Sequence, residues 1–122
     1  MTKIKILWKN KPHKNNYPAA KSYLQLIYKK KIANRMVEKL KKSSMSEFKA
    51  KDIFRASRLS LLGVSNFHVI KDKEKIKKKI KLSPILLVRD EETKKLIIAD
   101  GYHRLCAVYH YHEDALIPCK II

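Results

Sequence analysis

Apolar residues in the first third of the chain recur at the spacing of an α-helix, in two stripes that differ in phase. The stripes are Ala20, Tyr23, Leu24 and Ile27, followed by Ala33, Met36, Val37 and Leu40. Because residues three and four apart share one face of a helix, each stripe predicts a helix with one buried face. Pro18 suits the first residue of a helix, and the polar run Lys29–Lys31 separates the stripes. We therefore expect two helices, or one bent helix, that cover a core.

Later in the chain the apolar positions form short continuous runs, which are typical of strands buried on both faces. Two such runs are Ile85–Val88 and Leu96–Ala99, and Ile117–Ile121 is expected to be the last strand, with Pro118 permitted near its start. Between the last two segments, Leu105–Tyr111 has the spacing of an amphipathic helix. Near the start, Ile4–Trp8 alternates apolar and polar residues, which predicts an edge strand or a packed arm.

The middle of the chain is more polar. Leu59–His68 is expected to be a loop that covers one face of the sheet. Lys71–Ile80 predicts a short and very basic helix in which Ile76 and Ile80 point inward. Asp72 is expected to cap the start of this helix, because a carboxylate accepts hydrogen bonds from the free amides there.

The charge of the chain is large and unevenly distributed. At 122 residues the chain has the size of a single domain with one hydrophobic core, and its formal net charge is +18. Residues 1–82 hold 24 Lys and Arg against 5 Asp and Glu, whereas residues 83–122 hold 5 against 6. Such a field attracts nucleic acids and other polyanions. Since lysines outnumber arginines 24 to 5, a solvated basic surface without a partner is the other interpretation.

The cysteines and the first residues bear on location. Residues Met1–Trp8 are too few and too charged to form the apolar part of a signal peptide. No run approaches the roughly 18 apolar residues that a membrane span needs. We therefore expect a cytoplasmic protein without membrane contact, in which Cys106 and Cys119 are reduced.

The segment Asp100–Arg104, with the sequence Asp-Gly-Tyr-His-Arg, joins a predicted strand to a predicted helix. Gly101 suits the turn, and the amides after it begin the helix. A helix N-terminus has amides without intrahelical partners and carries the positive end of the helix dipole, so anions bind there. Arg104 adds a planar, permanently charged group that matches phosphate oxygens. The segment is therefore a candidate phosphate-binding turn.

The order of these features resembles the ParB/sulfiredoxin fold, specifically the nucleotide-binding domain of chromosome-partitioning ParB proteins. The segments that carry the resemblance are Ser83–Arg89, then Leu96–Ala107 with the pattern G-x-x-R-x-x-A at Gly101, Arg104 and Ala107, then Ile117–Ile121. The resemblance implies one α+β domain in which residues 47–122 form a small mixed sheet with flanking helices. Residues 1–46 would be an N-terminal arm and helical addition, and the linker-like Ser43–Ser46 would mark the boundary.

In the related families this turn binds nucleotide phosphates. The residues to which the resemblance assigns nucleotide or phosphate contacts are Gly101, Tyr102, His103, Arg104 and Arg55. Phe48–Ser57 would be the first strand and turn, with Arg55 near the strand end as in sulfiredoxins. A likeness to free-serine kinases of the same fold implies that Asp100 acts as a catalytic base or contacts a metal-bound water.

Several residues depart from these families. Tyr102 stands where sulfiredoxins have their reactive cysteine, so reduction of a sulfinic acid is not expected. The ParB cytidine triphosphatases have a glutamate there and an arginine at 103, so their route of hydrolysis lacks two residues. His103 and His110 lie about 10 Å apart along a helix, too far to share one ion, and no metal site is expected.

Three functional hypotheses follow. The first is a nucleotide or phosphate-ester binding protein, with Mg²⁺ as a companion of the nucleotide and with phosphotransferase or phosphohydrolase activity as its enzymatic form. The second is a DNA-binding or nuclease-like module in which the same turn holds a backbone phosphate. The basic residues that would follow the DNA strand are Lys75, Lys77, Lys78 and Lys79. The third is a scaffold that keeps the fold and binds no ligand.

Overall fold

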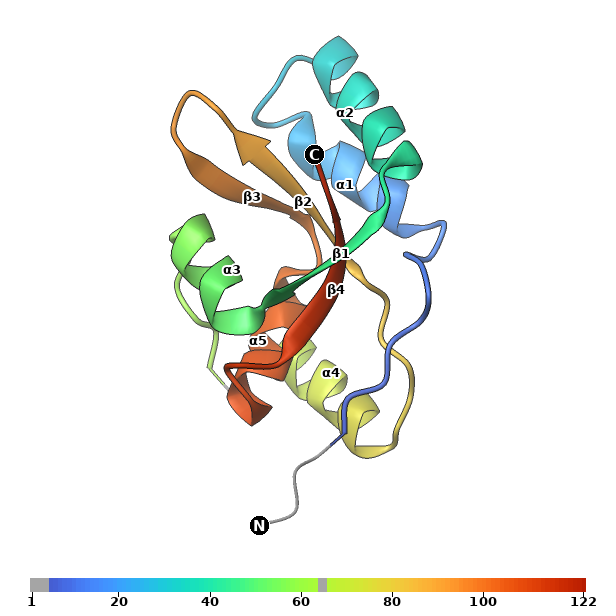
Figure 1. Ribbon diagram of the computed structural model, residues 1–122, viewed down its shortest axis with the longest axis vertical. Helices are drawn as coiled ribbons and strands as arrows, with labels where there is room; N and C mark the ends of the chain where they lie inside the picture. Colours follow the sequence, from blue (N-terminus) through green and yellow to red (C-terminus); the bar gives the residue numbers. More distant parts are fainter. Residues whose placement is uncertain (1–4, 64–65) are drawn as a thin grey trace.

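The fold is described by a computed structural model that covers residues 5–63 and 66–122. Its elements, in chain order, are α1 (Asn16–Leu24), α2 (Lys30–Lys42), β1 (Met45–Lys49), α3 (Ala50–Ser57), α4 (Phe67–Lys77), β2 (Ile85–Asp90), β3 (Lys95–Asp100), α5 (Tyr102–Tyr111) and β4 (Leu116–Ile121). The strands form one mixed sheet with helices around it, so the predicted α+β class is confirmed (Figure 1). The finer assignment to the ParB/sulfiredoxin fold stays a prediction.

The sheet has the strand order β1-β4-β2-β3. β2 and β3 form an antiparallel hairpin, β1 pairs with β4 antiparallel, and β2 pairs with β4 parallel. β2 is an inner strand, and its residues Ile85–Val88 are at most 1% exposed. The continuous apolar run predicted a strand covered on both faces, and the structure confirms it.

One face of the sheet is covered by α1 and α2, which lie together at the top of Figure 1. Their buried residues are Ala20, Leu24, Ala33, Val37 and Leu40, which pack on Leu86, Val88, Ile97 and Ala99 of β2 and β3. The prediction of two helices is confirmed. Tyr23 lies within α1 but is 43% exposed, and Ile27 lies beyond the end of α1 and is 46% exposed, so only Ala20 and Leu24 of the first stripe are buried.

The other face is covered by α3, α4 and α5. The strand residues Ile85, Leu87, Ile98, Ile117 and Cys119 form one core with Ile53, Phe54, Val69, Ile76, Leu105 and Val108. The chain before α1 adds a packed arm instead of a regular strand. Trp8 forms an isolated bridge with Leu82, and the first residue of the predicted Ile4–Trp8 segment lies outside the described residues.

The prediction of a strand over Phe48–Ser57 is wrong, because β1 ends at Lys49 and Ala50–Ser57 is the helix α3. The buried residues of this segment are Ala50, Ile53, Phe54 and Ser57, which follow the period of a helix. The linker expected at Ser43–Ser46 is also shorter than predicted, since Met45 and Ser46 belong to β1 and pair with β4.

The basic helix begins earlier than predicted. Asn66 caps it, since its side-chain oxygen accepts hydrogen bonds from the amides of His68 and Val69 at 3.0 and 3.2 Å. Asp72 therefore lies inside α4 and is not its cap. Ile80 follows the helix and is 48% exposed, so it does not point inward. Part of the predicted loop 59–68, residues 64 and 65, lies outside the described residues.

Among residues 5–63 and 66–122, no helix has both the length and the apolar character that crossing a membrane requires.

Candidate functional site

Gly101 forms the turn between β3 and α5, as the sequence predicted. Its φ is +111°, a conformation that side chains with a Cβ rarely adopt. A Cβ built at this position would lie 2.3 Å from Cγ2 of Ile85 and 2.9 Å from an Nη atom of Arg104. The turn brings the first residues of α5 so close to β2 that only glycine fits.

A polar pocket of about 240 Å³ opens beside this turn. Its walls come from α4 and from the junction of β3 with α5. The lining residues are His68, Lys71, Asp72 and Lys75 of α4, with Asp100, Gly101, Tyr102, His103 and Arg104 of the junction. The structure therefore brings together five of the predicted site residues around Gly101, and one of the four predicted DNA-contacting lysines.

The first residues of α5 line this pocket, and their amides have no cap among the described residues. Gly101 provides no side chain, and no side-chain hydrogen bond from residues 5–63 or 66–122 caps the helix. The first bond of the helix joins the Leu105 amide to the Gly101 carbonyl at 2.9 Å. Among the described residues, the amides of residues 102–104 have no backbone acceptor outside the helix. An anion in the polar pocket would find these free donors.

Arg104 has internal partners that the sequence analysis did not anticipate. One Nη atom donates to the Asp100 carboxylate at 2.9 Å and to the Pro84 carbonyl at 3.3 Å. The two ion-paired side chains are 17% and 16% exposed. The Arg104 Nε is buried and has no hydrogen-bond partner among the described residues. Arg104 therefore clamps the glycine turn, and its ion pair engages the Asp100 carboxylate.

Two histidines meet across the polar pocket. The ring centroids of His68 and His103 are 4.6 Å apart. Burial lowers the pKa of His103, and the neighbouring His68 and Arg104 lower it further, while Asp72 acts in the opposite direction. A bound anion would offset this penalty, because it favours the protonated ring.

Asp72 is the one half-buried carboxylate contributed by α4. Burial raises the pKa of Asp72, and the nearby charges of Lys75 and Arg104 partly oppose the rise. The Lys75 ammonium lies 3.9 Å from its carboxylate. A carboxyl with a raised pKa beside cationic groups is suited to acid and base exchange.

The hydroxyl of Tyr102 is hydrogen-bonded to the loop before α4. Its hydroxyl donates to the Ser60 carbonyl, and the His110 ring bonds the Leu62 carbonyl at 2.8 Å. Burial raises the pKa of Tyr102. Burial likewise raises the pKa of the Cys106 thiol, so this cysteine is a protonated core residue.

Four predicted contact residues lie elsewhere. Arg55 is exposed on the last turn of α3 and does not line the polar pocket, because the strand expected to carry it is a helix. Lys77, Lys78 and Lys79 are exposed at the end of α4, outside the pocket. The part of the chain that the structure describes has no group of three or more His, Cys, Asp or Glu placed to hold a metal ion.

The contribution of α4 to the polar pocket was not predicted from the sequence. His68, Lys71, Asp72 and Lys75 follow one another at intervals of three, one and three residues. This spacing places them on one helical face, and a helix start at Asn66 would have made the face visible.

The chain was compared with protein-family models, with curated proteins and with solved structures. None of the three comparisons finds a match.

Proposed function

We propose that this protein binds a phosphate ester, with a nucleotide as the leading candidate, in the polar pocket between α4 and α5. The observation that carries the proposal is the convergence of free donors on one concavity. The uncapped amides of α5 meet Lys71, Lys75 and the His68–His103 pair around about 240 Å³ of space. Positive groups of this kind recognise phosphate oxygens by charge-assisted hydrogen bonds.

Arg104 has a changed role in this proposal. Its ion pair with Asp100 fixes the turn from which the amides point, and its positive charge still borders the polar pocket. The direct cationic contact is assigned to Lys71, which is exposed, lines the pocket and has no carboxylate partner among the described residues. If a transfer or hydrolysis step occurs, the proposal assigns proton exchange to Asp72 because its pKa is raised.

Mg²⁺ enters the proposal as a companion of the nucleotide. No protein cluster of three ligating side chains occurs in residues 5–63 and 66–122, and Mg²⁺ is commonly held by substrate phosphates with one or two carboxylates. In that arrangement the phosphates of the nucleotide would coordinate the ion, and Asp72 would be the carboxylate of the polar pocket that is available to it.

The test is a ligand panel measured on the full chain by thermal unfolding and calorimetry. The panel contains the four ribonucleoside triphosphates, a nucleoside monophosphate, ribose 5-phosphate and inorganic phosphate, each with and without Mg²⁺. At least one phosphate ester should raise the unfolding temperature in a saturable manner. Lys71→Gln should weaken that ligand about fivefold, since it removes one charge near the phosphate, worth ~1 kcal/mol.

Lys31→Gln is the matched control. Lys31 is exposed on α2, on the opposite side of the sheet, and the substitution changes the net charge equally. An unfolding temperature unmoved by the entire panel would contradict the proposal. Equal weakening by the two variants would also contradict it, because the protein would then attract anions only through its overall charge.

A second candidate function is binding of nucleic acid, and the exposed end of α4 favours it. Lys77, Lys78 and Lys79 are exposed and form no ion pair among the described residues, and the polar pocket lies on the same helix. These three exposed ammonium groups follow the pocket-lining Lys75 in the chain and would contact consecutive backbone phosphates. The affinity of such an interface falls steeply with salt because counterions are released on binding.

The test replaces Lys77, Lys78 and Lys79 together by Gln and measures DNA binding between low and physiological salt. The slope of log affinity against log salt should become shallower by about 2 to 3. The matched control replaces the other lysine run, Lys29–Lys31, which is also exposed. Absence of binding at low salt, or equal effects of both triple variants, would contradict a specific interface.

A further inference from the structure

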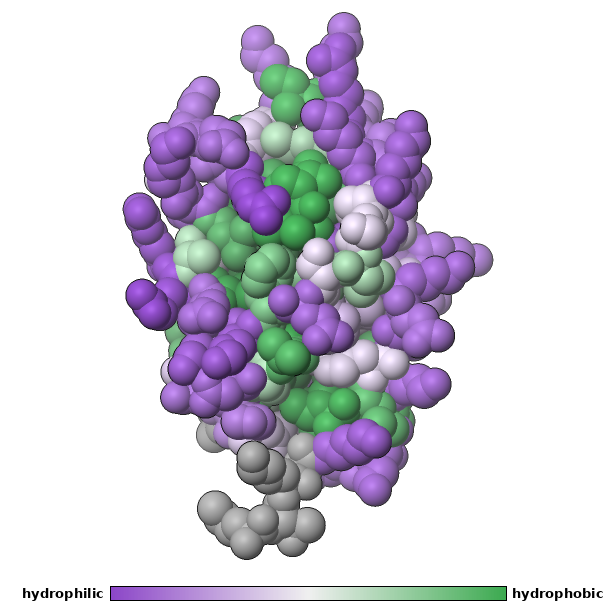
Figure 2. Space-filling model, in the orientation of Figure 1, coloured by the Kyte–Doolittle hydropathy of each residue, from purple (hydrophilic) through white to green (hydrophobic). Residues whose placement is uncertain are grey.

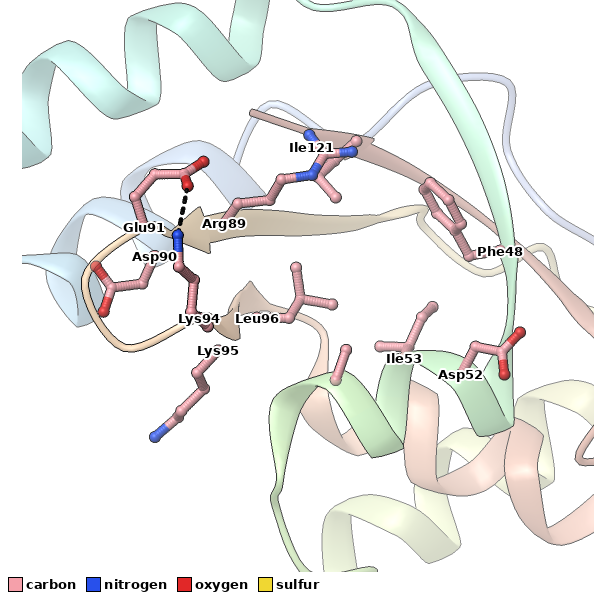
Figure 3. A pocket seen from close by; sticks show the side chains of 11 residues that line it. Phe48, Asp52, Ile53, Arg89, Asp90, Glu91, Lys94, Lys95, Leu96 and Ile121 are labelled. Atoms are coloured by element: carbon pink, nitrogen blue, oxygen red, sulfur yellow. Dashed lines mark ion pairs between the residues drawn. The ribbon is translucent and has the colours of Figure 1, made fainter.

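A second concave surface lies at the opposite end of the β2–β3 hairpin, where α3 leaves part of the sheet uncovered. This apolar groove has a volume of about 390 Å³. Its apolar floor consists of Phe48, Ile53, Ala56, Leu96 and Ile121. Figure 3 shows these side chains converging from β1, α3, β3 and β4. In Figure 2 apolar residues gather in the middle of the visible face and hydrophilic side chains border them.

Arg89 occupies a position in this groove where the fold would favour an apolar residue. Alternate residues of a strand share one face, so Arg89 follows Ile85 and Leu87 on the face that α3, α4 and α5 cover. It lies directly opposite Leu96 in the β2–β3 pairing. Figure 3 shows its side chain extended across the groove toward Ile121 and Phe48.

Within the part of the chain that the structure describes, the cationic charge of Arg89 has no carboxylate partner. Among the described residues no carboxylate lies within 4.0 Å of its guanidinium or of the Lys95 ammonium. The neighbouring acidic groups are already engaged. Glu91 pairs with Lys94 at 3.6 Å, and the Asp90 carboxylate accepts hydrogen bonds from Tyr28 at 3.1 Å and from Thr93.

Asp52 is the remaining carboxylate of the groove. It lies on α3, on the side away from Lys95 (Figure 3). The Arg89 side chain ends beside Ile121, next to the apolar floor.

We propose that the apolar groove is a binding site for a small apolar carboxylate, a molecule with a flat or chain-like hydrocarbon body and one anionic head. The body would cover Leu96, Ile53 and Ile121, and the carboxylate would form a bidentate pair with the Arg89 guanidinium. A guanidinium without a carboxylate partner beside apolar surface is matched by a ligand that has both characters, because the carboxylate pairs with the charge while the hydrocarbon body covers the apolar floor.

The test uses 2-naphthoate and its neutral analogue naphthalene-2-carboxamide, titrated into the full chain and followed by amide NMR shifts. The two probes have the same apolar body and differ in charge. We expect 2-naphthoate to bind saturably, with shifts at residues 48–56, 89–96 and 121, and about tenfold more tightly than the carboxamide.

Two variants assign the contacts. Arg89→Gln should remove the tenfold preference for 2-naphthoate over the carboxamide. Ala56→Trp should abolish binding of both probes, since Ala56 is exposed on α3 and an indole there would fill the groove. Arg35→Gln is the matched control, because Arg35 is an exposed arginine on α2, on the other side of the sheet.

Three outcomes would overturn the proposal. Equal affinity for the two probes would remove the role of the guanidinium. Equal weakening by Arg35→Gln and Arg89→Gln would mean that only the net charge attracts 2-naphthoate. Shifts confined to the polar pocket around Gly101 would place the anion at the other site, leaving the proposal for the apolar groove without support.

Discussion

The β2–β3 hairpin has a concave surface at each end, and one arginine stands at each. At the end near Asp100, Arg104 is ion-paired at 2.9 Å and is 17% exposed. At the end near Asp90, Arg89 is exposed and has no carboxylate partner among the described residues. The polar pocket is bordered by histidines, lysines and helix amides, whereas the apolar groove is floored by hydrocarbon.

The surroundings of the two arginines distinguish a charge that supports the fold from a charge that is available to a ligand. A partly buried ion pair that joins a strand end to a helix holds local geometry, and losing one partner leaves the other charge poorly solvated. An unpaired charge over apolar surface contributes little to the fold. Arg104 therefore supports the fold, and Arg89 is available to a ligand. The sequence motif, in contrast, predicted the ligand contact at Arg104.

The largest expected effect comes from breaking the turn of the polar pocket. Gly101→Ala should lower the free energy of unfolding by about 3 kcal/mol, from the positive φ and from the contact with Ile85. The measurement is chemical denaturation. In an Ile85→Ala background the added cost of Gly101→Ala should fall by about 1 kcal/mol, because the 2.3 Å contact with Cγ2 of Ile85 is removed, while the 2.7 Å contact with the Cβ of residue 85 and the backbone strain remain. An unchanged cost in that background would show that the branched side chain of Ile85 is not the obstacle.

The next effect concerns the ion pair at the same turn. Arg104→Met should cost about 2 kcal/mol of unfolding free energy, since it leaves the Asp100 carboxylate, 16% exposed, without its partner. In an Asp100→Asn background the same substitution should cost clearly less, with a coupling of about 1.5 kcal/mol. Denaturation of the four proteins of this cycle measures the coupling. A coupling near zero would mean that Arg104 is free to serve a ligand alone.

A smaller effect is expected from acid. Burial lowers the pKa of His103 below its usual value of 6.5, so the unfolded chain takes up this proton at higher pH than the folded protein. The His103 contribution to stability is therefore complete above about pH 6.5 and is lost as the pH falls toward the folded pKa. Asp72, with a raised pKa, gives the opposite slope at lower pH.

The measurement is unfolding free energy against pH for the wild type and His103→Gln. The variant should lose the decline below about pH 6.5, while His112→Gln, which changes an exposed histidine, should keep it. Parallel curves for the wild type and His103→Gln would contradict the buried environment of His103.

Most of the fold was predictable because burial imposes a period on the sequence. The runs of β2, β3 and β4 and the stripes of α1 and α2 all appear in the apolar pattern. α3 was missed because an assumed family strand was placed over Phe48–Ser57, although four buried positions there have helical spacing. The start of α4 depends on the cap at Asn66, which is a signal of a single residue. The helix was instead predicted to begin with the basic run at Lys71.

The candidate sites were predictable only where they depend on local chain geometry. Gly101 and the amides after it follow from a strand-turn-helix pattern, and the spacing of Asp100 and Arg104 already permits an ion pair. The meeting of His68 with His103 requires α4 to pack beside α5, which no local pattern specifies. The apolar groove arises where helices leave sheet uncovered, so only the assembled structure reveals it.

The smallest expected effect is the sharpest test of the contrast between the two arginines. Arg89→Leu should change the free energy of unfolding by no more than about 0.5 kcal/mol, and in the stabilising direction, because leucine continues the apolar row of Ile85 and Leu87 and breaks no ion pair. Chemical denaturation of Arg89→Leu, run in parallel with Arg104→Met, measures the change in unfolding free energy. If Arg89→Leu instead costs as much as Arg104→Met, then Arg89 supports the fold, and the two ends of the hairpin do not differ in the way described.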